Sequence, residues 1–216
     1  MDGLSARRLR ISRVATLAGG ITCTGLGIAG MLRAHFGTDP FDAINASVGR
    51  ITGLSVGVAS WLNVGLVLAL AWILGRRPRV GTVVVGLGIG LVINLGLALL
   101  PVQHGIVVRA VLAAASLAVL YLGVTGYVIS DLGAGALEEL MLALVARGAK
   151  LRSARWGIEA VLLAVAFGLR GPIGIVTVAF VLLTGPVLAW TIPFLARLVR
   201  LPLPHHDPNV PLGDIR

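Results

Sequence analysis

The chain has 216 residues, of which 57% are hydrophobic and only 12% are charged, and its formal net charge is +9. An ordinary soluble domain carries about 25% charged residues, so this composition excludes a water-soluble globule. The basic residues lie at the ends of apolar runs rather than in a patch with interleaved aromatic residues, which argues against nucleic-acid binding.

Six apolar runs approach the roughly 20 residues that a helix needs to cross a bilayer. They are continuous rather than alternating, which excludes outer-membrane strands. The first run follows a basic segment, as in a signal peptide, but its length predicts a retained span. The fifth run is short and begins nearer Ser153. The predicted spans are Val14–Leu32, Val56–Leu74, Val80–Leu100, Ala110–Ile129, Trp156–Leu169 and Ile173–Leu195.

Lys and Arg residues predict the orientation of these six spans. With the N-terminus in the cytoplasm, fourteen of the 18 basic residues fall inside and four outside, as the positive-inside rule requires. We therefore predict a membrane domain over residues 1–197 in the bacterial inner membrane. The proline-rich segment 198–216 is predicted to be a flexible cytoplasmic tail. We interpret His205 and His206 as solvated tail residues, and we predict no metal site.

The two halves of the chain resemble each other. Residues about 11–100 match residues about 106–197 at a spacing of 96, which falls to 95 after the second loop. Three spans in each half would invert the second half relative to the first, a plan that recurs in transporters. The fold prediction is an all-α polytopic bundle of two inverted three-helix repeats. The alternative is chance coincidence among many glycines. Matched positions include Gly27 with Gly123, Asp42 with Glu138, and Thr82 with Thr177.

Several short motifs in this chain match those of a known family. The chain carries TGLGIAG, FGTDPFDAI, TGLSVGVAS and GRRPRVGT in its first half, and DLGAGALEEL and GPIGIVT in its second. Over residues 7–197 it resembles the YczE/YitT-type uncharacterised bacterial membrane proteins. The resemblance implies a multi-pass inner-membrane protein and no known reaction. The chain departs from the pattern at Ala136 and Val176.

Short helices are expected after the first and fourth spans, over Pro40–Arg50 and Leu137–Arg147. Asp39 can cap the first, and Pro40 suits its first turn. Asp42 and Glu138 then lie near the two helix starts, where the helix dipole favours an anion. One interpretation is capping at the membrane surface. The other is a pair of helices that dip into a vestibule, where their carboxylates bind a solute.

Polar residues within the spans are further candidates for a substrate site. Asn63 lies in the second span, and Glu159 occupies the matching place in the fifth. Glu159 is either a buried functional carboxylate or the partner of Arg155 one helical turn away. Asn63 is either functional or a hydrogen-bonding contact between helices, as is expected of Asn94.

Glycines interrupt the third and sixth spans. Gly90 lies in a GxxxG pattern with Gly86, and Gly185 precedes a proline. Close helix packing explains both. Alternatively, both positions mark broken helices that line a binding site.

We predict a small-solute transporter or permease with Asp42, Asn63, Gly90, Glu138, Glu159 and Gly185 as substrate-binding residues. The alternative is a non-catalytic accessory or scaffold protein, or a substrate-binding subunit for a separate ATPase. The sequence lacks a nucleotide-binding motif and an assignable nucleophile set, so no enzyme activity or cofactor is predicted. The expected partners are the lipid bilayer and a small solute. Self-association, a membrane partner protein, the substrate and any coupling ion are left open.

Overall fold

The computed structural model describes residues 2–199 and 201, with the backbone alone for residues 2–6 and 8. These residues form eight helices without a strand among them, which confirms the all-helical prediction. The predicted tail beyond Leu201, with His205 and His206, lies outside the described residues. The helices are α1 (Asp2–Ala34), α2 (Pro40–Thr52), α3 (Val56–Ile73), α4 (Val80–Leu99), α5 (Ile106–Ser130), α6 (Ala136–Ala146), α7 (Leu151–Gly168) and α8 (Ile175–Val199).

Five of the described helices are long and apolar enough to cross a membrane: α1 over Leu9–Ala34, α3, α4, α5 and α8. They coincide with five of the six predicted spans. The remaining prediction, Trp156–Leu169, falls on α7, which is not among the five. Its 18 residues include three charged side chains, Arg152, Arg155 and Glu159. The count of six spans therefore stays a prediction.

Large apolar side chains cover the outside of these helices. On α3 and α4, for example, Leu66 is 60% exposed, Ile73 is 75% exposed and Val80 is 82% exposed. The same holds for Leu182 on α8, at 62%. So large an apolar surface is unfavourable in water, whereas lipid tails are as apolar as the exposed side chains. The exposed faces of the five helices therefore contact the bilayer.

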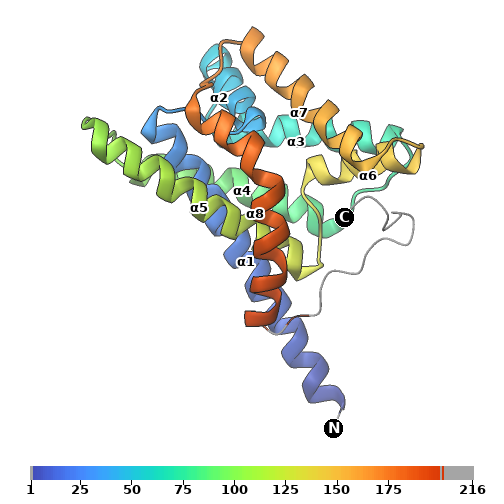
Figure 1. The fold of residues 1–216 in the computed structure, drawn as a ribbon. Helices are drawn as coiled ribbons and strands as arrows, with labels where there is room; N and C mark the ends of the chain where they lie inside the picture. Colours follow the sequence, from blue (N-terminus) through green and yellow to red (C-terminus); the bar gives the residue numbers. More distant parts are fainter. Residues whose placement is uncertain (1, 200, 202–216) are drawn as a thin grey trace.

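The centre of the bundle is α1, which is the most buried candidate span, with 56% of its most apolar window buried against 22–33% for the others. It packs along α5, and α5 in turn packs against α8 (Figure 1). Gly20 and Gly123 allow the close approach of α1 and α5. A methyl group on Gly20 would come within 2.4 Å of the Tyr127 amide nitrogen, and one on Gly123 within 2.3 Å of the Thr24 amide nitrogen. Small residues thus let the two backbones meet, as in other membrane helix pairs.

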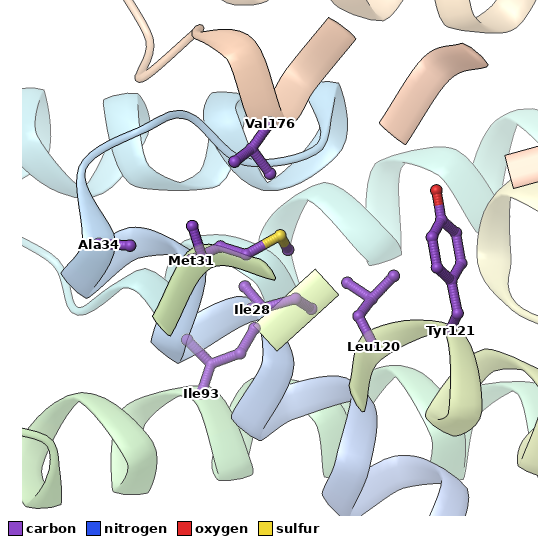
Figure 2. Close-up of a cluster of buried hydrophobic side chains, with 8 residues drawn as sticks. Ile28, Met31, Ala34, Ile93, Leu120, Tyr121 and Val176 are labelled. Atoms are coloured by element: carbon purple, nitrogen blue, oxygen red, sulfur yellow. The ribbon is translucent and has the colours of Figure 1, made fainter. Parts of the chain in front are cut away.

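Figure 2 shows the apolar core that joins four of the candidate spans. Met31 of α1 and Ile93 of α4 are fully buried there, and Leu120 of α5 lies beside them. Val176, in the first turn of α8, also contributes to this core. The Tyr121 hydroxyl lies 3.3 Å from the Phe180 carbonyl oxygen, to which it donates a hydrogen bond. Helices α2, α6 and α7 contribute no residue to this cluster and pack mainly against α3 and one another.

The two helices for which interruption at glycine was the alternative interpretation are continuous. Helix α4 runs through Gly90, and α8 runs through Gly185 and Pro186. The interpretation of these positions as broken helices is therefore wrong. Gly90 instead allows close packing, because a methyl group there would come within 2.3 Å of the Trp61 indole nitrogen. Gly185 is exposed and has no atom within 4 Å of a methyl group built on it.

The backbone repeats itself along the chain. The order of a long helix, a short helix and two long helices occurs in α1–α4 and again in α5–α8. Of the seven left-handed residues in the described part of the chain, all but Gly37 follow the same order at a spacing of 95 or 96. They form three pairs: His35 with Asp131, Gly53 with Gly148, and Gly75 with Arg170.

Two contacts between the halves are also reciprocal. Arg109 of α5 donates a hydrogen bond to the Ala34 carbonyl oxygen at the end of α1, with 2.8 Å between Nε and O. Arg13 of α1, the residue at the matching position, forms an ion pair of 3.6 Å with Asp131 at the end of α5. Each basic residue therefore contacts the carboxyl end of the first helix of the other half, where the helix dipole favours a cation.

Candidate functional site

A cavity of ≈ 140 Å³ lies among the helices, and all eight helices contribute to its lining. Its apolar wall includes Ile28, Val64, Ile89, Leu162 and Phe180. Polar groups concentrate at the starts of α2 and α6 and along one face of α7. The polar and charged lining residues are Thr24, Asp39, Asp42, Ser60, Tyr127, Glu138, Arg155 and Glu159.

The start of α2 places two aspartates in the cavity. Asp39 is the N-cap, as the sequence predicted, and its side chain accepts a hydrogen bond of 3.1 Å from the Asp42 amide. Pro40 occupies the first turn. Asp42 is 5% exposed, and its Oδ1 accepts a hydrogen bond of 2.7 Å from the Asn45 side chain. Helix capping therefore aims Asp39 at the backbone, whereas Asn45 orients the Asp42 carboxylate.

Burial acts strongly on this pair. Helix α2 is not one of the candidate membrane spans, and both aspartates are nearly inaccessible to water. Burial raises the pKa of Asp39, although its hydrogen bonds with Asp42 and Thr38 oppose the shift. Burial and then the neighbouring charge of Asp39 raise the pKa of Asp42 well above its usual range. The negative charge of Asp39 thus adds to burial in favouring the protonated form of Asp42.

The start of α6 places one glutamate in the same cavity. The N-cap is Gly135, which has no side chain, and Glu138 lies three residues later, as Asp42 does after Asp39. The Glu138 carboxylate folds back over Gly135, because a methyl group there would come within 2.1 Å of Oε2. The Tyr127 hydroxyl lies beside the same point. Glycine at position 135 is thus required for this orientation of Glu138.

Helix α7 contributes one carboxylate and one guanidinium. Arg155 Nη2 lies 3.4 Å from Glu159 Oε1, so these residues form the pair that their spacing of four suggested. The Glu159 side chain is 14% exposed and the Arg155 side chain 36% exposed. Both nevertheless line the cavity. Glu159 therefore both pairs with Arg155 and lines the cavity.

The six residues predicted to bind substrate divide into two groups. Asp42, Glu138 and Glu159 line the cavity, whereas Asn63, Gly90 and Gly185 do not. Asn63 donates a hydrogen bond of 3.0 Å to the side chain of Asn45, so it contacts Asp42 only indirectly.

Sequence reasoning overlooked Asn45, Thr24 and Tyr127. Asn45 had a detectable signal, because it lies three residues after Asp42 and so shares its helix face. Thr24 and Tyr127 had no comparable signal, since one hydroxyl within an apolar run does not reveal which way it faces. Their place in the lining follows from the packing of α1 on α5.

Most of the lining residues fall in pairs at the spacing that relates the two halves of the sequence. Fourteen of the 22 form seven pairs at a spacing of 95 or 96 residues. The cavity therefore collects matching positions from the two halves, although the chemistry differs within most pairs. The pairs are Thr24 with Leu120, Asp39 with Gly135, Phe41 with Leu137, Asp42 with Glu138, Ser60 with Arg155, Val64 with Glu159, and Val85 with Phe180.

Bilayer-facing apolar helices around a partly polar cavity define a multi-pass helical membrane protein. The comparisons with known proteins agree. A model described as "Family of unknown function (DUF6198)" matches residues 11–193, and the chain belongs to that family. It is also similar to the uncharacterized membrane protein YczE of Bacillus subtilis (strain 168). The two are 29% identical over 166 residues, which cover 76% of this chain and 77% of the relative.

The YczE-type resemblance in the sequence is thereby confirmed. No solved structure matches this fold.

Proposed function

We propose that this protein is a bacterial inner-membrane permease for a small solute, with its binding site in the cavity lined by all eight helices. The observation that carries the proposal is the arrangement of that cavity. Matched positions of the two halves meet around it, and buried carboxylates face into it. Charged groups inside a membrane protein are costly, so their presence there is typical of a functional site. The protein would act as a carrier and not as an enzyme.

The proposed architecture is two inverted halves with α7 as the sixth span. The paired left-handed residues and the reciprocal contacts of Arg13 and Arg109 support it. An odd number of spans in each half makes the halves antiparallel, so a site between them can open to either side when one half rocks against the other. The positive-inside distribution supports cytoplasmic N- and C-termini.

A labelling experiment tests the inverted architecture. Single cysteines are introduced at Thr52, the last residue of α2, and at Lys150, between α6 and α7, in a Cys23→Ser background. Both native residues are exposed. A membrane-impermeant thiol reagent should label Thr52→Cys from the periplasmic side and Lys150→Cys from the cytoplasmic side. Labelling of both from the same side would contradict the inversion.

A second labelling experiment tests transport without knowledge of the substrate. Ser60 is 2% exposed and lines the cavity, whereas its neighbour Ala59 is fully buried outside the lining. In the Cys23→Ser background, Ser60→Cys should react with an impermeant reagent in both right-side-out and inside-out vesicles. Ala59→Cys should react in neither. Reaction of Ser60→Cys from one side alone would favour the accessory or substrate-binding-subunit alternative.

A further inference from the structure

The cavity lining holds more acidic than basic side chains. Among the residues that the structure describes, four with carboxyl groups line the cavity, Asp39, Asp42, Glu138 and Glu159, and Arg155 is the one basic residue in the lining. The amino ends of α2 and α6 add about half a positive charge each. Full ionisation would leave about two uncompensated negative charges in a site largely withdrawn from water. An occupant with a positive charge would offset them, whereas an anion would add to the repulsion.

An unpartnered hydroxyl also points to a ligand. Thr24 lies on α1, is 4% exposed, and lines the cavity. Its Oγ1 is buried and makes no hydrogen bond with any described residue. A buried polar group without a partner costs about 1–3 kcal/mol. A solute that occupies the cavity can supply the missing hydrogen bond.

The apolar part of the lining restricts the occupant further. Ile28, Ile89, Leu162 and Phe180 present hydrocarbon to the cavity and offer no ligand for a bare ion. Among the described residues, no group of three or more His, Cys, Asp or Glu side chains is arranged to hold a metal. The volume of ≈ 140 Å³ is close to that of an engineered cavity of about 150 Å³ that holds benzene. An organic solute of about six non-hydrogen atoms fits that space.

We propose that the cavity binds a small organic amine in its cationic form, with the ammonium group between Asp42 and Glu138 and the hydrocarbon part against the apolar wall. This proposal rests on the proposed permease function and names its class of substrate. Asn45 orients Asp42, and the absence of a side chain at Gly135 leaves room for the Glu138 carboxylate. The Arg155–Glu159 pair closes the α7 side without adding net charge.

The test is calorimetric titration of the full-length purified protein in lipid nanodiscs. The probes are cyclopentylamine, the neutral cyclopentanol, the anionic cyclopentanecarboxylate, and Mg²⁺. Cyclopentylamine should bind saturably at one site and at least tenfold more tightly than the neutral and anionic probes. Tighter binding of the carboxylate or of Mg²⁺ would overturn the proposal.

Three variants and one control locate the site. Asp42→Asn and Glu138→Gln should each weaken cyclopentylamine binding at least tenfold, and Thr24→Val should weaken it about fivefold. Asp131→Asn removes a carboxylate outside the cavity and should leave the affinity unchanged. Glu138 is less buried than Asp42, so Glu138→Gln keeps the test decisive if Asp42→Asn fails to fold. Unchanged affinity in well-folded Glu138→Gln would overturn the proposal.

Different outcomes would overturn the permease proposal and the amine-binding proposal. Labelling of Ser60→Cys from both sides without saturable amine binding overturns the amine assignment and leaves the permease standing. Saturable amine binding with labelling from one side alone supports the binding site and overturns transport.

Discussion

Arg76 contacts the buried carboxylate of Glu139, with 2.5 Å between Nε and Oε2. Arg76 lies in the connection between α3 and α4, whereas Glu139 lies in the first turn of α6. The Glu139 side chain is 3% exposed, and Thr82 of α4 lies 3.3 Å from its other oxygen. Glu139 thus attaches the second half of the chain to the first at a point outside the cavity lining.

Loss of Arg76 should destabilise the protein, because Glu139 would then keep a buried charge without its cationic partner. We expect Arg76→Gln to lower the free energy of unfolding by about 3 kcal/mol. Arg77→Gln, at an exposed neighbour, should change it by less than about 0.5 kcal/mol. Denaturation in mixed micelles measures both. Equal stability of the two variants would show that the ion pair contributes little.

Asn45 and Asn63 should be energetically coupled, because the Asn63 side chain hydrogen-bonds the residue that orients Asp42. Asn45→Ala and Asn63→Ala should each destabilise the protein. Their double variant should lose less than the sum, with a coupling of about 1 kcal/mol. Asn94, which accepts a hydrogen bond from the Gly57 amide, provides the control. Asn45→Ala and Asn94→Ala should be additive, and additivity of Asn45→Ala with Asn63→Ala would contradict the contact.

Neighbouring glycines of α1 should differ sharply in their tolerance of alanine. A methyl group on Gly20 meets the α5 backbone at 2.4 Å, whereas one on Gly19 meets nothing within 4 Å. Gly20→Ala should separate the two helices and cost about 1–3 kcal/mol, and Gly19→Ala should be neutral or slightly stabilising. Thermal unfolding in detergent distinguishes them. Similar melting temperatures would argue against the close α1–α5 contact.

Amine binding should depend on pH through Asp42. Burial and the charge of Asp39 raise the pKa of Asp42, so a proton occupies this carboxyl at a pH where an ordinary aspartate is ionised. A bound cation favours the ionised form and releases the proton. Affinity should therefore rise with pH until Asp42 is ionised in the empty protein. The other charged or titratable groups around the cavity are Asp39, Tyr127, Glu138, Arg155 and Glu159.

Calorimetry in two buffers of different ionisation enthalpy measures this proton release. The heats should differ for the wild type and agree for Asp42→Asn. Proton release that persists in Asp42→Asn would assign the titration to another of the cavity carboxylates.

The amino-acid sequence by itself predicted the apolar helices, the short helices α2 and α6, the Asp39 cap and the family. Each of these depends on contacts within about one helical turn or on the solvent around a run of side chains. Pro40 and Asp39, for example, start α2 through local backbone geometry alone. Such signals are present in the linear order of residues, and the structure reproduces them closely.

Only the tertiary structure decided which polar residues share a cavity. The sequence matched Glu159 with Asn63, but the cavity pairs Glu159 with Val64, one residue further on. A shift of one residue rotates a side chain by about 100° around a helix. This rotation takes Asn63 out of the cavity and towards Asn45. Packing of α3 against α2, α4 and α6 sets that rotation. The apolar pattern therefore predicted the spans, whereas the tertiary structure decided the lining of the site.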